Sequence, residues 1–160
     1  MPTYLQCDTT CTTDCGACKG RGVVRQFTGD YAFLSNFYTE PNGLSVEHRF
    51  QATKSLDPRV RDEVLLARTP GAAKRLGGKR GIVTPRPDWE DIKLSVMRDL
   101  VAAKFREPEL REKLLATGDA YLQEGNRWND TYWGVSLQTG KGRNELGKIL
   151  MAVREEARRG

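Results

Sequence analysis

The sequence has little of several residue types that build common functional sites. It contains a single histidine, His48, which favours neither a His-based metal site nor a Ser-His-Asp triad, so we expect this residue at the surface or in helix packing. It has no run of about eighteen apolar residues, as a membrane-spanning helix needs, so we expect no membrane partner. The polar residues 1–13 lack the basic and apolar regions of a secretory signal, which predicts a cytoplasmic protein.

Cysteine is absent after residue 18. The four cysteines are Cys7, Cys11, Cys15 and Cys18. Residues 1–22 are too polar to build a core, so we expect a Cys-rich extension, 1–22, ahead of one domain, 23–160. Residues 15–22 resemble one CxxCxGxG repeat of DnaJ-type zinc domains, in which two repeats supply four thiolates. With one repeat, a structural zinc held by all four cysteines and reduced free thiols both stay open.

The net charge of +5 favours anionic partners. The basic residues are nevertheless spread along the chain, with acidic residues among them. This distribution favours phosphate-bearing small substrates over a dedicated nucleic-acid-binding face.

Apolar periodicity and capping residues predict a mainly helical α+β fold with short strands. Ser45 is a typical N-cap, and Asp57-Pro58 and Thr69-Pro70 each place a capping residue before a proline at the first helical position. The expected helices are 46–56, two short helices after Asp57 and Thr69, 88–106, 110–115, and one after residue 144. The expected strands lie in 23–38, around a turn at 28–30, and in 120–124 and 132–136.

Three polar residues share one face of the helix expected at 46–56. Glu47, Gln51 and Lys54 stand at positions i, i+4 and i+7. A carboxylate, an amide and an amine on one face could converge on a polyhydroxylated ligand. The alternative is a solvated helix face with an ordinary charge pair.

Two further segments could bind a ligand. The loop at 140–144 ends at a helix N-terminus, where free N–H groups, Lys141 and Arg143 would attract phosphate, unless it is only a solvated turn. Asp130, Trp133 and Gly134 offer a carboxylate and an aromatic plate for a base or sugar. Core packing is the alternative for Trp133, because tryptophan buries a large area.

Separated blocks of the sequence resemble the NADAR superfamily, which includes the YbiA-like N-glycosidases. The matching text is FLSNFY at 33–38, VEH at 46–48, FQA at 50–52 with Lys54, AK at 73–74, LG at 76–77, Trp89, VM at 96–97, KF at 104–105, Leu115, TGD at 117–119, Leu122, Glu124, Asp130, WG at 133–134, Asn144, LG at 146–147, LM at 150–151 and VR at 153–154. Order and approximate spacing hold from about Phe27 to Arg154, so chance agreement is a poor explanation.

The resemblance implies a single NADAR/YbiA-like domain that hydrolyses an N-glycosidic bond to ribose and requires no cofactor. Family substrates include ribosylamino-pyrimidine phosphates of riboflavin synthesis and ADP-ribose attached to guanine. The expected partner is therefore a ribose-phosphate or ADP-ribose-bearing substrate, ADP-ribosylated nucleic acid included. The family uses a lysine that forms a Schiff base with the opened ribose, and Lys54 occupies that motif position. Glu47 would stabilise the cationic, oxocarbenium-like transition state.

These roles extend to a set of expected site residues. We expect Glu47, Lys54 and Asp130 to be catalytic. We expect Asn36 and Gln51 to bind ribose hydroxyls and Trp133 to stack on the substrate. Phosphate is expected to contact Lys141, Arg143 and Asn144. Further substrate contacts are expected from Trp89, Glu124 and Gly134. The Lys54 amine must be neutral to attack, which burial or a neighbouring cation such as His48 or Arg49 would favour.

The chain departs from the family pattern at three places. Residues 38–46 are shorter than the usual text, Arg49 replaces a common aromatic, and the cysteine segment lies outside the pattern. An alternative function is a non-catalytic module that binds ADP-ribose or NAD as a sensor, although binding alone needs no nucleophilic amine. A small zinc-dependent nucleic-acid-binding protein would explain the cysteines and the charge but not the matched blocks.

Overall fold

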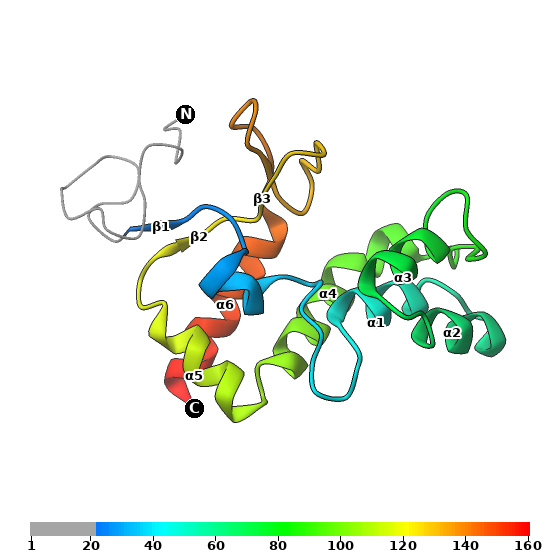
Figure 1. The fold of residues 1–160 in the computed structure, drawn as a ribbon, viewed down its shortest axis with the longest axis horizontal. Helices are drawn as coiled ribbons and strands as arrows, with labels where there is room; N and C mark the ends of the chain where they lie inside the picture. The colour runs from blue at the N-terminus through cyan, green and yellow to red at the C-terminus, as the bar shows by residue number, and fades with distance from the viewer. Residues whose placement is uncertain (1–21) are drawn as a thin grey trace. The chain divides into compact units, whose positions relative to one another are not determined.

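The computed structural model describes residues 22–160 (Figure 1). The four cysteines lie outside these residues, so the zinc site and the 1–22 boundary stay predictions. The chain divides into two compact units. Asn36–Lys104 forms one, here called the central unit, and residues 22–35 together with Phe105–Gly160 form the other, here called the terminal unit. Each is described by itself.

All the regular secondary structure of the central unit is helical. The helices are α1 (Val46–Thr53), α2 (Pro58–Leu65), α3 (Pro70–Leu76) and α4 (Trp89–Lys104). The predicted caps are confirmed for α2, where Asp57 accepts from the N–H of Arg59, and for α3, where Thr69 accepts from the N–H of Ala72. The starts of these helices therefore follow from local side-chain hydrogen bonds that the sequence already displays.

His48 closes the N-terminus of α1 together with Ser45. The Ser45 hydroxyl accepts from the His48 N–H, and the Ser45 N–H donates to His48 Nδ1, 3.2 Å away. His48 Nε2 lies 2.9 Å from the carbonyl oxygen of Ala67, which can only accept, so the ring proton resides on Nε2. His48 is buried, which confirms helix packing and excludes the surface position.

Small apolar side chains hold α1, α2 and α3 together. The buried cluster between them consists of Ala52, Val64, Ala73 and Val83, with Val60, Leu65, Ala67 and Leu76 packed against it. Close helix approach through alanine and valine places the polar face of α1 inside the unit rather than in solvent.

The terminal unit combines short strands with two helices. Its elements are β1 (Val23–Val24), the 3₁₀ helix η2 (Gly29–Leu34), α5 (Pro108–Ala116), β2 (Tyr121–Leu122), β3 (Gly125–Asn126), β4 (Val135–Ser136) and α6 (Glu145–Arg159). β1 pairs with β2 and β3 pairs with β4, both in parallel. The apolar stripe predicted for the last helix, from Leu146 to Val153, is buried.

The mainly helical α+β fold is confirmed, but the strands were over-predicted. In residues 23–38 a single two-residue strand, β1, is followed by η2. Phe33 and Leu34 are neighbours and both are buried. A strand would have pointed them to opposite faces, whereas a 3₁₀ turn buries both. The strands predicted at 120–124 and 132–136 shrink to β2 and β4, and β3 was not predicted.

The described residues contain no helix of the length and apolarity needed to cross a membrane.

Lys104, the last residue of α4, is unusual because it is 3% exposed. Its Nζ lies 5.2 Å from the centre of the Tyr38 ring. Burial lowers the pKa of Lys104 from 10.5 to about 7, and the charge of Glu40 opposes this shift. A buried ammonium is expensive to desolvate, so this side chain is held partly in its neutral form at neutral pH.

We expect Lys104→Met to stabilise the protein in a pH-dependent manner. Between pH 7 and 10.5 the unfolded wild type binds a proton that the folded protein does not, so its free energy of unfolding rises with pH in this window. The methionine variant lacks this dependence. Urea unfolding should therefore show it to be more stable than the wild type at and below pH 7, with the difference shrinking toward pH 10.5. A pH-independent difference, or the same gain in the exposed control Lys79→Met, would contradict the assignment.

Candidate active site

The predicted polar face of α1 is buried. Glu47 is 6% exposed and Gln51 is 5% exposed, so they do not form a solvated helix face. A buried carboxylate is stable only where polar partners replace its water. Here Gln51 Nε2 donates to Glu47 Oε1 across 2.6 Å. The structure thus brings the predicted acid and amide into direct contact, one helical turn apart.

The hydrogen bond to Glu47 fixes the orientation of the Gln51 amide. A carboxylate oxygen accepts, so the amide nitrogen must face Glu47 and the amide oxygen must point elsewhere. No donor among residues 22–160 reaches Gln51 Oε1, although this atom is buried. An unpaired buried acceptor costs about 1–3 kcal/mol. A ligand hydroxyl that donated to this oxygen would remove the penalty.

Lys54 caps the C-terminal end of α1 and is half-buried. Its Nζ donates to the carbonyl oxygen of Gly77 across 3.2 Å and lies 5.8 Å from the Phe50 ring centre and 5.9 Å from the Trp89 ring centre. Burial lowers the pKa of Lys54, and the charge of Glu47 opposes this shift. Lys74 lowers the pKa further. The result is a larger neutral fraction of the amine than on an exposed lysine.

The cations that act on Lys54 differ from those expected. Lys74 and Lys93 lower its pKa by charge repulsion. His48 and Arg49, its neighbours in sequence, do not: His48 bonds Ser45 and Ala67, and Arg49 forms an ion pair with Glu40. Their side chains leave α1 in other directions, because residues five or six positions apart on a helix face different sides.

Two other predicted residues of the central unit flank this cluster. Trp89 is buried and packs against Phe50, with ring centres 4.9 Å apart. It therefore forms a wall beside the amine. The Asn36 carbonyl oxygen accepts from the Glu47 N–H, and the Asn36 amide reaches Met97 Sδ at 3.4 Å. Asn36 thus lies at the N-terminal end of the same helix.

Sequence reasoning missed Phe50 and Gly77. Phe50 stands four residues before Lys54, so helical spacing could have placed its ring under the amine. Gly77 entered only as part of the LG match at 76–77. A Cβ at Gly77 would lie 2.0 Å from Gln51 Oε1, so only glycine leaves room for the amide. No sequence signal links Gly77 to Gln51, because α3 must first pack on α1.

In the terminal unit, Asp130 organises the loop between β3 and β4. Its Oδ1 accepts from the N–H groups of Tyr132 and Trp133, at 3.1 and 2.9 Å. These bonds hold the backbone in a turn and explain why the strand predicted from residue 132 begins only at Val135. Trp133 is half-buried and meets the Tyr132 ring edge-on, 4.9 Å between centres.

Gly134 and Asn144 hold this loop close to Glu124. A Cβ at Gly134 would lie 2.2 Å from the Glu124 carbonyl oxygen, so the position admits only glycine. The Asn144 amide nitrogen donates to the Leu122 carbonyl and the Tyr121 hydroxyl, and its oxygen accepts from the Glu124 N–H. All three hydrogen bonds of the Asn144 side chain are structural, which leaves its expected phosphate contact a prediction.

Lys141 and Arg143 are exposed, as a phosphate-binding loop requires. Arg143 Nε donates to Glu145 Oε1 across 3.0 Å, and the guanidinium carbon lies 4.7 Å from the centre of the Tyr132 ring. The loop meets the expected description of a solvated basic segment before a helix N-terminus.

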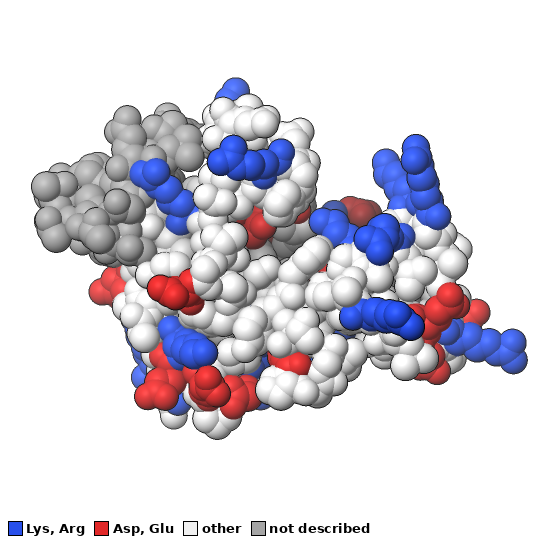
Figure 2. Space-filling model, viewed as in Figure 1, with Lys and Arg blue, Asp and Glu red and all other residues white. Residues whose placement is uncertain are grey.

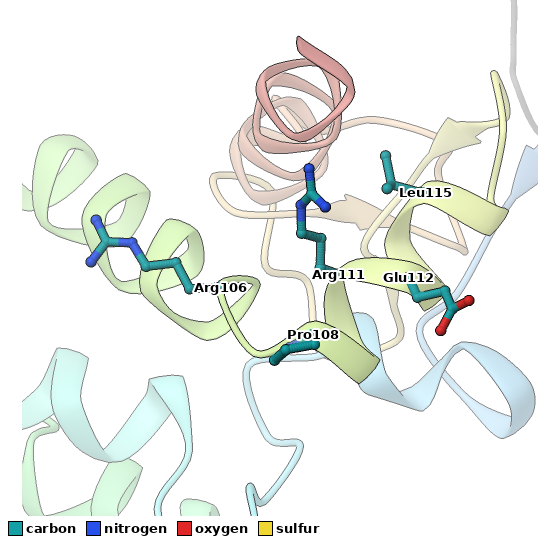
Figure 3. A pocket seen from close by; sticks show the side chains of 5 residues that line it. All are labelled: Arg106, Pro108, Arg111, Glu112 and Leu115. Atoms are coloured by element: carbon teal, nitrogen blue, oxygen red, sulfur yellow. The ribbon is translucent and has the colours of Figure 1, made fainter. Parts of the chain in front are cut away.

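A cavity of about 460 Å³ in the terminal unit contains none of the predicted site residues. It is lined by Arg106, Pro108, Arg111, Glu112 and Leu115 (Figure 3). The Arg111 guanidinium points toward α6, where it donates to the Ala157 carbonyl. This arginine is therefore occupied in tying α5 to α6.

Known proteins resemble this chain over most of its length. The N-glycosidase YbiA of Escherichia coli strain K12 is 42% identical over 134 residues, which cover 79% of this chain and 82% of that protein. An N-glycosidase of Nostoc punctiforme is 39% identical over 140 residues, 80% of this chain and 86% of that protein. A riboflavin biosynthesis protein of Vibrio vulnificus is 42% identical over 136 residues, 79% of this chain but 36% of that protein.

The fold agrees with these similarities. The NMR structure of E. coli YbiA superposes with a TM-score of 0.70 at 39% identity, covering 84% of this chain and 87% of that one. A family model described as the NADAR domain matches residues 25–158, which include every predicted site residue except the four cysteines. This chain belongs to the NADAR domain family.

Proposed function

We propose that this protein is a hydrolase acting on N-glycosyl bonds, and that it releases ADP-ribose or a ribose phosphate from the base or amine it carries. The observation that carries the proposal is the cluster of the buried Glu47 and Gln51 with the half-buried Lys54, in which a partly desolvated amine lies within the electrostatic reach of a carboxylate. Relatives named N-glycosidases and riboflavin biosynthesis proteins support the same reaction class.

Lys54 is the proposed nucleophile. When the ribose ring opens, C1′ becomes an electrophilic iminium carbon that the neutral Lys54 amine can add to. Expulsion of the original nitrogen, which leaves with a proton, breaks the N-glycosidic bond and forms a Schiff base between Nζ and C1′. Water then adds to C1′, and loss of the Lys54 amine yields the free sugar aldehyde, which closes to ribose.

Glu47 is the proposed acid–base and electrostatic group. Positive charge develops on the sugar as the bond to nitrogen weakens, and a buried carboxylate stabilises such charge better than water does. Its bond to Gln51 holds one carboxylate oxygen in place. Gln51 Oε1, which lacks a donor within residues 22–160, is suited to accept from a ribose hydroxyl.

The terminal unit is proposed to supply further substrate contacts. Asp130 is assigned as a second catalytic carboxylate, because its Oδ1 is bound to the backbone and the group is thereby fixed in direction. Lys141 and Arg143 are assigned to phosphate, and Trp133 to stacking.

Borohydride should trap Lys54 during turnover. Reduction of the Schiff base joins the ribose to Nζ through a stable secondary amine, which peptide mass spectrometry locates. Lys54→Ala should give no adduct and lower kcat on the order of a thousandfold or more. Lys79→Ala, which removes an exposed lysine of the same unit, is the matched control.

Full activity of Lys54→Ala would overturn the covalent mechanism. Tight binding of ADP-ribose by the wild type without any release from N-glycosides would instead identify a sensor module.

Glu47→Gln should keep the fold and lose activity. The amide can still accept from Gln51, but it bears no charge to stabilise the cationic sugar and cannot transfer a proton. We expect kcat to fall about a hundred- to ten-thousandfold, with a thermal midpoint near that of the wild type. Glu63→Gln, on the exposed side of α2, should behave as wild type. If Glu47→Gln retained activity, the active site would lie elsewhere in the protein.

Lys74→Met should shift the pH dependence of kcat/KM to higher pH. The Lys74 charge disfavours the protonated form of Lys54, so its removal raises the pKa of Lys54 and reduces the neutral amine at a given pH. The ascending limb of the profile should therefore move toward the alkaline side. Arg75→Met, the next residue of α3, is the control and should leave the limb in place. An unmoved or acid-shifted limb in Lys74→Met would contradict Lys54 as the titrating nucleophile.

A further inference from the structure

The amine of Lys54 has one hydrogen-bond partner within residues 22–160 and two aromatic neighbours. Its Nζ donates to the Gly77 carbonyl oxygen across 3.2 Å, and it lies 5.8 Å from the ring centre of Phe50 and 5.9 Å from that of Trp89. A cation within about 6 Å of a ring centre is attracted by the negative face of the ring. Both rings are therefore close enough to act on a charge at this nitrogen.

Packing and backbone hydrogen bonds hold the two rings in place. Phe50 is 5% exposed and Trp89 is 6% exposed, and they pack against each other. The Lys54 carbonyl accepts from the Arg86 N–H across 2.7 Å, and the Arg86 carbonyl accepts from the Trp89 N–H across 3.1 Å. The start of α4 is thus anchored on the residue whose amine it flanks.

Charged groups of the central unit act on Lys54 only through space. No ion pair joins Lys54 to a carboxylate among the described residues. Glu47 of α1 and Glu90 of α4 favour the charged amine, whereas Lys74 of α3 and Lys93 of α4 disfavour it.

The segment that contains α3 is basic. Residues 64–87 include six lysines and arginines and no aspartate or glutamate. Figure 2 shows Lys and Arg side chains over this part of the central unit. This segment therefore offers no carboxylate to a cation at Lys54, and among the described residues the two rings and the Gly77 carbonyl are the groups that lie against Nζ.

We propose that Phe50 and Trp89 are positioning residues that stabilise the cationic Schiff base between Lys54 and C1′ of the ribose. This role rests on the proposed function, because it concerns an intermediate of that reaction. When the original nitrogen leaves with one proton of the amine, Nζ keeps one proton and the positive charge as an iminium, NH⁺=C1′. Both rings lie within reach of this charge, and the Gly77 carbonyl is placed to accept the remaining proton.

Aromatic faces suit a nitrogen that must gain and lose charge. A carboxylate in contact with Nζ would hold the resting ammonium strongly and keep the amine protonated. A ring face attracts a cation more weakly and has no basic atom that could take the iminium proton. The amine can therefore be neutral when it attacks and stabilised when it becomes cationic.

Ribose 5-phosphate tests this role without cleavage of a glycosidic bond. Its open-chain aldehyde condenses with the Lys54 amine, takes up a proton and releases water, which gives the same iminium. Cyanoborohydride reduces the iminium by hydride transfer to a secondary amine, and peptide mass spectrometry quantifies the adduct at Lys54. The adduct at the exposed Lys79 in the same sample serves as an internal reference.

Fluorinated rings weaken the attraction and keep the shape. Site-specific incorporation of mono-, di- and trifluorophenylalanine at Phe50 makes the ring face less negative in steps. The Lys54 adduct should fall with each fluorine, about two- to fivefold over the series. The pKa of Lys54, read from NMR titration of its Cε resonance, should fall in parallel, because the ammonium loses the same attraction. Fluorinated tryptophans at Trp89 should act in the same direction.

The same amino acids at Phe33 and Trp128 are the matched controls. One position is buried and the other is 66% exposed, both in the terminal unit, and neither series should change the adduct or the pKa of Lys54. Equal adduct across the Phe50 series, or losses that follow the thermal midpoint and not the number of fluorines, would overturn the role of the rings. So would a wild type that forms no adduct at Lys54. A graded loss of adduct in a protein that cleaves no N-glycoside would support the rings' role and refute the proposed function alone.

Discussion

The hydrogen bond between Gln51 and Glu47 is the constraint on which the central unit depends. A carboxylate 6% exposed would be unstable without a donor, and Gln51 supplies one from the next turn of the same helix. The bond also decides which atom of the amide faces away from the carboxylate. Burial therefore leaves a fixed acid, a fixed acceptor and, one turn further on, a partly desolvated amine at Lys54.

This arrangement is possible only because the neighbouring backbone approaches closely. A Cβ at Gly77 would overlap the Gln51 amide, and the Gly77 carbonyl accepts the hydrogen bond of Lys54. The small core residues that pack α2 and α3 against α1 allow the same approach. Packing and electrostatics thus act together: the tighter the helices lie, the less water reaches the amine, and the lower its pKa becomes.

In the terminal unit, close backbone approach and buried hydrogen bonds also hold side chains in place, but there they act on loops. Asn144 bonds three groups of the segment around β2, and Gly134 leaves no space for a side chain beside Glu124. Asn126 and Asp130 then lock the tip that carries Trp128. The buried amides of Asn126 and Asn144 thus fix the loop at 127–131 and the start of α6.

What the sequence could predict was local. Capping residues such as Asp57 and Thr69 predicted the starts of α2 and α3, because an N-cap side chain accepts a hydrogen bond from an N–H two or three positions ahead. Strands were predicted less well, because a two-residue strand such as β1 exists only through its distant partner β2. The spacing of Glu47, Gln51 and Lys54 also predicted their arrangement, since helical periodicity places them on one face.

The sequence by itself therefore determined the helices, their caps, the shared face on α1 and the family resemblance. Only the tertiary structure decided that this face is buried and that Lys74 rather than Arg49 acts on Lys54. The physical reason is distance along the chain: burial, charge repulsion and loop pairing depend on residues that no short-range pattern connects.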